Sequence, residues 1–197
     1  MLDIKKYAKI PEGYQILERL PEDPADCITF GIMYETAMVQ ISAHSIPVDK
    51  AIPFNVEHTI EGTRHFLSPD QALIEAGNGK TAEGNPFVYT IVKMKMEPSG
   101  VQYILHLNEW IGDECFQIHG QFVENGMTGM RDTTIYSYLR QEGILKEAGD
   151  PNWWRDPYDD NDPHPFKMNL SELEQFDEAF PGHPLSLCRD YLKTVIE

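Results

Sequence analysis

The sequence predicts an α+β fold: an antiparallel sheet with a meander at 87–124, helices on one face of the sheet, and a C-terminal loop and helical extension. Three consecutive segments are rich in the β-branched and aromatic residues that favour strands: 87–97, 101–111 and 114–124. Two short turns of hairpin composition separate them: Pro98-Ser99-Gly100 and Gly112-Asp113. Apolar residues at helical spacing occur before and after the meander and predict helices that cover the sheet.

The register of the meander follows if Ile111 pairs with Glu114 across the second turn. One face, the core face, would then carry two apolar pairs: Leu107 with Ile118, and Tyr103 with Phe122. The other face would pair His106 with His119, which could be metal ligands or a pH-sensitive pair. One alignment of the preceding strand puts Lys93 beside His106, and an ammonium there would oppose a divalent cation. An ordinary solvated or helix-covered face is the alternative interpretation.

A strand pair and a helix are predicted before the meander. The two strands are joined by a short hairpin connection: 28–34 and 38–44. A helix then begins with Asp49 as its N-cap and tolerates Pro53 in its first turns. Its apolar stripe would cover the sheet: Ile52, Val56, Ile60, Thr63 and Leu67. Beyond this helix we expect a brief strand at 72–75 and a glycine-rich loop at 77–80.

Helices and a long loop are predicted after the meander. The segment 128–142 predicts a helix that ends at Gly143, and 149–167 predicts an unusually long loop. Asn169 and Glu172 form a capping-box pattern before Leu173, Phe176 and Phe180, which have helical spacing. A last helix starts at Pro184 and carries an apolar stripe: Leu185, Cys188, Tyr191, Leu192 and Val195. We therefore expect a sheet domain at 1–146, with residues 147–197 as an extension packed on the same domain.

The order of these elements resembles a known fold. A Pro-x-Gly-aromatic entry, Ile10-Pro11-Glu12-Gly13-Tyr14, leads into a strand pair, a helix, a β-meander and a second helix. This order resembles the PsbP/Mog-like fold, shared by a photosystem extrinsic protein and a nuclear-import factor, over residues 10–143. The resemblance implies a mostly non-catalytic scaffold that binds another protein. The tail resembles the end of uncharacterised bacterial proteins through two stretches: 168–171 and 180–186.

Charge and cysteine usage restrict the partners and the compartment. The 197 residues carry a formal net charge of −16, which would repel nucleic acid and anionic membrane surfaces and would attract a basic protein. The same charge can also serve solubility alone. The three widely spaced cysteines indicate neither a disulfide framework nor a zinc knuckle. With no signal peptide or membrane span in the pattern, we expect a cytoplasmic protein that needs no cofactor.

One metal site is conceivable. His58, Glu61 and His65 would share a helix face, and imidazole with carboxylate suits zinc. The alternative interpretation is a solvated helix face, into which Arg64 intrudes. No nucleophile motif such as G-x-S-x-G accompanies these residues. The corresponding function would be a metal-dependent hydrolase or a small-ligand-binding enzyme, in which the ion activates water.

The segment around Trp153, Trp154 and Tyr158 is the candidate partner-binding site. Adjacent indoles in a proline-rich loop supply large anchors of the kind that dominate protein interfaces. They could equally fasten the C-terminal extension to its own domain, because tryptophan is usually well buried. We expect a non-enzymatic, acidic protein-binding module of the immunity or adaptor type. A structural subunit is a third possibility, and the sequence leaves the oligomeric state open.

Overall fold

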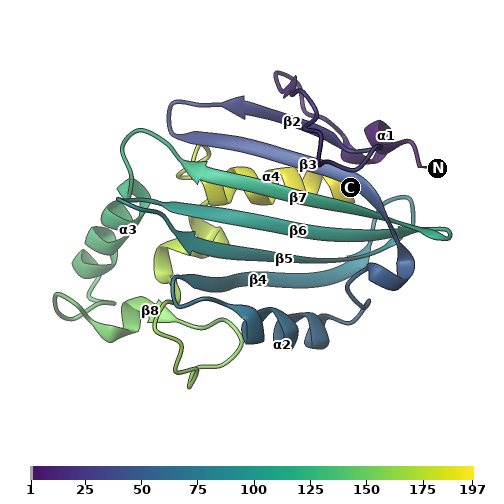
Figure 1. The fold of residues 1–197 in the computed structure, drawn as a ribbon. Coiled ribbons are helices and arrows are strands. Elements are labelled where there is room, and N and C mark those ends of the chain that lie inside the picture. Colours follow the sequence, from purple (N-terminus) through teal and green to yellow (C-terminus); the bar gives the residue numbers. More distant parts are fainter. Residues whose placement is uncertain (1) are drawn as a thin grey trace.

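The computed structural model describes residues 2–197 and confirms the predicted α+β class. Within these residues, one antiparallel sheet has the strand order β1-β2-β3-β7-β6-β5-β4 (Figure 1). Its strands are β1 (Gln15–Ile16), β2 (Ile28–Met33), β3 (Ala37–Pro47), β4 (Gln71–Lys80), β5 (Pro86–Lys95), β6 (Val101–Ile111) and β7 (Glu114–Glu124). The α-helices are α1 (Ile4–Ala8), α2 (Val56–Phe66), α3 (Met130–Gln141) and α4 (Pro184–Ile196), and a small second sheet pairs β8 (Trp154–Arg155) with β9 (Met168–Asn169).

The predicted meander and its main register are confirmed. Ile111 pairs with Glu114, and the two histidines pair across β6 and β7. The core face carries the expected residues, all less than 2% exposed: Tyr103, Leu107, Ile118 and Phe122. The alignment that put Lys93 beside His106 is wrong, because Lys93 pairs with Tyr103. The turn before β6 pairs Lys95 with Val101, and this pairing turns the Lys93 side chain toward the core face.

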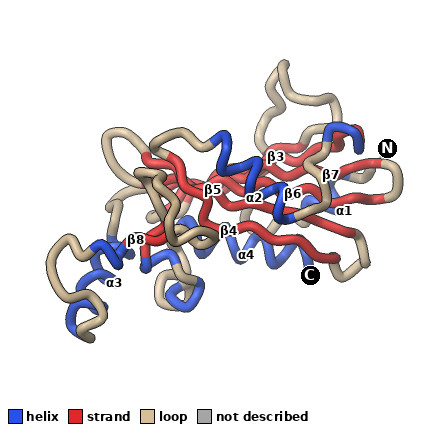
Figure 2. Tube along the Cα trace, turned by 90° about the horizontal axis from the view of Figure 1, so that it is seen from below, coloured by secondary structure: helices blue, strands red, loops and turns tan. Residues whose placement is uncertain are grey.

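Helices lie on both sides of the sheet instead of sharing one face. Helix α4 crosses behind the sheet in the view of Figure 1 and packs against β3, β6 and β7, and α1 packs against β3 and β7. Helix α2 lies on the opposite side (Figure 2), where it packs against β4 and β5. The apolar stripe predicted for α4 is buried: Leu185, Cys188, Tyr191, Leu192 and Val195. The main core therefore lies between α4 and the sheet.

Two predictions before the meander are wrong in detail. Helix α2 starts after Asn55, whose side chain accepts a hydrogen bond from the His58 amide, and Asp49 lies in a separate 3-10 turn. Pro53 explains the shift, because a residue that precedes proline disfavours helical backbone angles. The expected loop at 77–80 is instead the second half of β4. Gly77 is required there, since a Cβ would lie 2.7 Å from the Tyr89 ring.

The tail after the long loop forms turns instead of the helix expected from Leu173, Phe176 and Phe180. The capping box of Asn169 and Glu172 is present, but it begins a 3-10 turn, Leu170–Glu172, that a second turn, Glu174–Phe176, follows. Leu173 has extended backbone angles and interrupts the helical path. Within residues 2–197, no helix has the length and apolar character needed to cross a bilayer.

Candidate functional site

A buried ionic network joins the C-terminal segment to the sheet, with Glu172 at one centre. The Tyr103 hydroxyl donates a 2.6 Å hydrogen bond to the Glu172 carboxylate, and Lys93 Nζ lies 3.1 Å from the same group. The Lys93 and Glu172 side chains are 2% and 0% exposed. Burial and the nearby Glu172 charge raise the pKa of Tyr103 well above its ordinary value, so the phenol keeps its proton and acts as a donor.

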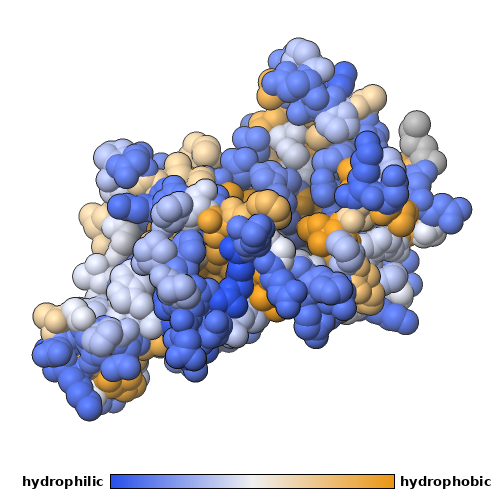
Figure 3. Space-filling model, turned by 60° about the horizontal axis from the view of Figure 1, so that its bottom comes forward, coloured by the Kyte–Doolittle hydropathy of each residue, from blue (hydrophilic) through white to orange (hydrophobic). Residues whose placement is uncertain are grey.

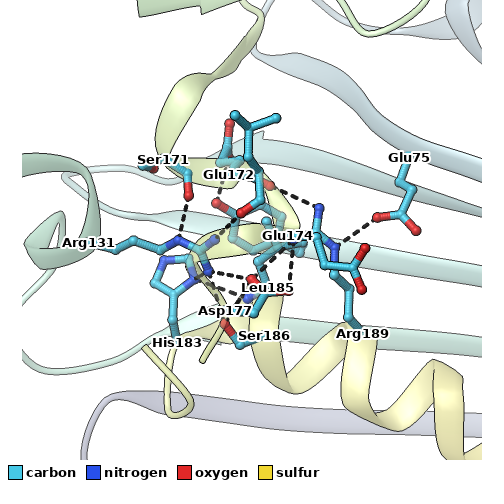
Figure 4. A network of polar contacts seen from close by, with 12 residues as sticks. Glu75, Arg131, Ser171, Glu172, Glu174, Asp177, His183, Leu185, Ser186 and Arg189 are labelled. Carbon is cyan, nitrogen blue, oxygen red and sulfur yellow. Dashed lines mark hydrogen bonds and ion pairs between the residues drawn. The ribbon is translucent and has the colours of Figure 1, made fainter. Parts of the chain in front are cut away.

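Arg131 of α3 is the second centre of the network (Figure 4). Its guanidinium is fully buried and lies 2.9 Å from the Asp177 carboxylate. It also donates hydrogen bonds to the Ser171 carbonyl and to the Ser186 hydroxyl, at 2.7 and 2.9 Å. One side chain thus connects α3, the turns at 170–177 and the start of α4. These hydrogen bonds and the ion pair offset the free-energy cost of removing the guanidinium from water.

Arg189 extends the network along α4. Its Nη1 lies 3.0 Å from Asp177, and its Nε donates a 2.8 Å hydrogen bond to Glu75 on β4 (Figure 4). The network therefore spans the sheet, α3, α4 and the tail. These contacts hold the turns at 170–177 against β5, α3 and α4.

The aromatic segment divides into two anchors and one exposed indole. Trp153 is 7% exposed, lies 5.1 Å from the Tyr136 ring and belongs to a small core with Ile135 and Leu139 of α3. The Tyr158 hydroxyl accepts a hydrogen bond from the Ala76 amide at the outer edge of β4, and burial raises the pKa of Tyr158 to about 12. Trp153 thus connects this segment to α3, and Tyr158 connects it to β4.

Trp154, unlike Trp153, is accessible to solvent. It is 47% exposed, and the Lys93 ammonium lies 5.7 Å from its ring. The same ammonium lies 4.8 Å from the Phe166 ring, so the buried lysine forms cation–π contacts with both aromatic rings. The two rings line a cavity of about 400 Å³ that we call the aromatic pocket: Pro151, Trp154, Asp160, Pro165, Phe166 and Lys167.

The acidic residues of the same loop are arranged around Arg64 of α2. The Asp162 carboxylate accepts a hydrogen bond from Arg64, and Asp156 and Asp159 lie 3.9 and 3.7 Å from the guanidinium. This pairing lowers the pKa of Asp162. Asp160, by contrast, forms no ion pair with any residue in the described range and is exposed beside the aromatic pocket.

The predicted metal-site residues His58, Glu61 and His65 are all exposed on α2. In residues 2–197, no group of three or more His, Cys, Asp or Glu side chains is arranged to hold a metal ion. The intruding Arg64 turns to the acidic loop.

His106 and His119 do come together, on the sheet face opposite α4. Their Nδ1 atoms are 3.3 Å apart, and His119 also contacts the amide of Gln121. Burial and the neighbouring imidazole lower the pKa of His106 to about 4, and burial with His44 lowers the pKa of His119. Both rings are neutral at neutral pH, so one ring can donate a hydrogen bond to the other.

Several residues of the network gave no local signal in the sequence. Lys93 and Tyr103 follow ordinary strand alternation, and Arg131 occupies an ordinary helix position. Only the Asn169 and Glu172 spacing indicated a local function, as a helix cap. Their partners are distant in sequence, as Glu172 is 79 residues from Lys93. The network became visible only with the fold.

Comparison with known proteins gives structural similarity alone. No family model matches the chain, and no curated protein matches it. A Pseudomonas aeruginosa protein of unknown function has 10% identity and a TM-score of 0.38, and the match covers 70% of this chain and 98% of that one. The Ran-binding protein Mog1p of Saccharomyces cerevisiae has 10% identity and a TM-score of 0.41, with coverage of 65% and 75%. Cyanobacterial PsbP (CyanoP) from Synechocystis has 14% identity and a TM-score of 0.37, with coverage of 67% and 79%.

The two families that the order of elements resembles are thus both represented among the similar structures. All three TM-scores are below 0.5 and all three identities are 14% or lower, so this similarity carries no conclusion about function.

Proposed function

We propose that this protein is a binding module that captures a basic segment of another protein in the aromatic pocket. The observation that carries this proposal is the half-exposed indole of Trp154, which lines the same pocket as Asp160, a carboxylate in no ion pair within residues 2–197. Tryptophan at the centre of a rigid surface is the residue type that most often dominates a protein interface.

The position of Trp154 is fixed from two directions. Its neighbour Trp153 is buried against α3, and β8 pairs Trp154 with Asn169 of β9. Asn169 is fully buried and belongs to the capping box of the ionic network. A side chain that is fixed before binding loses little conformational entropy when a partner docks, and this favours affinity.

Charge and shape favour an arginine or lysine side chain as the inserted group. Its aliphatic stem would pack on the Trp154 and Phe166 rings, and its cationic head would reach Asp160. Lys167 also lines the pocket, and its ammonium donates a hydrogen bond to the backbone carbonyl of Asp162. The net charge of −16 adds long-range attraction that would accelerate capture of a basic partner. On the face shown in Figure 3, hydrophilic side chains dominate and apolar ones form small separate patches, which suits a polar partner.

Affinity capture from cell extract at low salt, with quantitative mass spectrometry, tests the proposal. The wild-type protein should enrich one basic protein, and Trp154→Ala should reduce its recovery at least ten-fold. Phe66→Ala is the matched control, because Phe66 is an aromatic residue that is 82% exposed on α2 and does not line the pocket. Recovery with Phe66→Ala should equal that of the wild type.

Asp160→Asn tests the charged part of the pocket. It should weaken capture of the same protein and make the remaining binding less sensitive to salt. The proposal is wrong if no protein is enriched, or if the enriched protein is retained equally by Trp154→Ala and the wild type.

A further inference from the structure

A second cavity lies at the other end of the tail, between α3 and the start of α4. It has a volume of about 350 Å³ and a largely apolar lining, and we call it the methionine cleft. The residues that carry the argument are Glu124, Met127, Met130, Phe180 and His183. A mostly apolar cavity of this size with a few convergent polar groups is typical of a small-ligand site.

Glu124 is the polar group without a compensating charge. Its side chain is 7% exposed, and its carboxylate accepts hydrogen bonds from the amides of Gly129 and Val101, both at 3.1 Å. The nearest basic group is His183, whose Nε2 lies 3.7 Å from the carboxylate. Among residues 2–197, no lysine or arginine lies within 4 Å of it.

His183 is neutral and does not balance this charge. Its Nδ1 accepts a hydrogen bond from the Leu185 amide, so the ring proton is on Nε2, which lies 3.7 Å from the Glu124 carboxylate and forms no hydrogen bond with it. Burial, with the positive charge of Arg131 nearby, lowers the pKa of His183 to about 3. The imidazole beside Glu124 is therefore neutral, and the hydrogen bonds to the carboxylate come from the Gly129 and Val101 amides.

The surrounding network has an excess of negative charge. Its three cations each pair with a carboxylate: Lys93, Arg131 and Arg189. Three carboxylates pair with these cations: Glu75, Glu172 and Asp177. Two more lie at the edge of the network and form no ion pair with a lysine or arginine within residues 2–197: Glu124, and Asp132, which accepts a hydrogen bond from the Ser171 hydroxyl. A charge balance of minus two in a largely buried cluster favours the binding of a cation.

The rest of the cleft is suited to an aliphatic chain. Met127 and Met130 are 75% and 51% exposed at the rim, and thioether side chains adapt to apolar ligands of varied shape. Arg131 also lines the cleft, but its guanidinium is paired with Asp177, and its guanidinium carbon lies 5.9 Å from the centroid of the Phe180 ring. The cleft thus combines one buried carboxylate with flexible apolar walls.

We propose that the methionine cleft binds a primary ammonium group on an aliphatic chain, with the ammonium at Glu124 and the chain against Met127, Met130 and Phe180. This site is separate from the aromatic pocket and does not depend on it. The ligand can be a free alkylamine or the lysine side chain of a peptide, since both have the same chemistry.

Titration of the full chain with n-hexylamine, followed by NMR of its 13C-labelled methionine methyl groups, tests the proposal. The methyl signals of Met127 and Met130 should shift in a saturable way. Met94, which contacts Gln71 on β4, should not move and is the internal control. n-Hexanol and hexanoate, which lack the ammonium, should bind at least ten-fold more weakly. Equal shifts with all three probes, or no saturable shift with n-hexylamine, would overturn the proposal.

Two variants separate the charge from the fold. Glu124→Gln should remove the preference for n-hexylamine over n-hexanol, whereas Glu61→Gln, the same change on the exposed face of α2, should leave it intact. If Glu124→Gln does not fold, Met130→Ser at the exposed rim should still weaken n-hexylamine binding several-fold. Unchanged binding by Glu124→Gln, or by Met130→Ser if Glu124→Gln does not fold, contradicts the proposal.

The source of the ammonium group is distinguished by a further pair of probes. Nα-acetyl-lysine N-methylamide binding more tightly than n-butylamine assigns the site to a lysine side chain of a protein. The reverse order assigns it to a free amine. Trp154→Ala should bind both probes as the wild type does, so a failure of the protein-binding proposal leaves this result unaffected.

Discussion

The ammonium of Lys93 and the carboxylate of Glu172 lie 3.1 Å apart with both side chains almost wholly removed from solvent. Lys93 comes from the middle of the sheet, and Glu172 comes from the tail. Glu172 also accepts a 2.7 Å hydrogen bond from the Asn169 amide, so the same carboxylate closes the turn that precedes it. The buried charge of Lys93 is therefore neutralised only when the tail that carries Glu172 packs against the sheet.

Removal of Glu172 should be strongly destabilising. Glu172→Ala leaves the Lys93 ammonium buried without a counter-charge, and we expect a loss of about 3 to 5 kcal/mol in the free energy of unfolding. Urea denaturation followed by circular dichroism measures this loss. The double variant Lys93→Met with Glu172→Leu removes both charges and should recover a large part of it. An unchanged urea midpoint for Glu172→Ala would show that the pair does not hold the tail.

The two adjacent tryptophans should differ in their effect on stability. Trp153→Ala removes a buried ring from the core at α3 and should cost about 3 to 5 kcal/mol. Trp154→Ala removes a half-exposed ring and should cost far less. Thermal unfolding of the two variants side by side measures the difference. Equal losses would mean that Trp154 is as structural as Trp153.

Replacement of Gly77 in β4 should destabilise the protein, for a reason that differs from the turn that the sequence predicted at 77–80. Gly77→Ala would place a Cβ 2.7 Å from the Tyr89 ring, whose hydroxyl donates a 2.7 Å hydrogen bond to Glu75. Movement of the ring would disturb this bond, so we expect a loss of about 1 to 3 kcal/mol. Gly62→Ala in α2 has open space around the new Cβ and should stabilise by about 0.5 to 1 kcal/mol. Chemical denaturation of both variants tests the opposite signs.

Stability should fall as the solution becomes mildly acidic. The folded protein holds the pKa of His106 at about 4 and that of His183 at about 3, below the ordinary value of 6.5, mainly through burial. Between pH 6.5 and these values the unfolded chain binds protons that the folded chain does not, so the stabilisation is full above pH 6.5 and is lost as the pH falls. The loss is at most about 1.4 kcal/mol per pH unit for each histidine.

Urea unfolding at a series of pH values measures this dependence. His106→Gln removes one of the titrating groups and should make the fall in stability between pH 6.5 and pH 4 less steep. A variant at the exposed His58 should behave as the wild type does. Equal slopes for His106→Gln and the wild type would show that His106 is not protonated differently in the two states.

The meander could be predicted from the sequence because its signals are local. A two-residue turn at Gly112-Asp113 fixes the pairing of Ile111 with Glu114, and each later pair follows from strand alternation. The side of the sheet that α2 covers was not predictable, because its half-buried stripe is compatible with either face. The same ambiguity applied to the turns after Asn169, where helical spacing of apolar residues occurs without a helix.

The candidate sites were less predictable than the fold, because they combine distant residues. The two adjacent indoles could be recognised in the sequence as a candidate site. Which of them is buried and which is exposed depends on the pairing of Trp154 with Asn169. Phe166 and Asp160 gave no sign that they share a pocket with Trp154. Glu124 looked like the last residue of a strand, and only the return of the chain at His183 makes it part of a cleft.

The Tyr158 hydroxyl limits edge-to-edge association of two copies of this chain through β4. It accepts a hydrogen bond from the Ala76 amide and donates one to the Ala76 carbonyl, at the outer edge of the last strand of the sheet. A foreign strand would need both of these groups to extend the sheet. The Tyr158 side chain therefore blocks the free edge of β4. A second copy of the chain could extend the sheet at this edge only after Tyr158 moves away from Ala76.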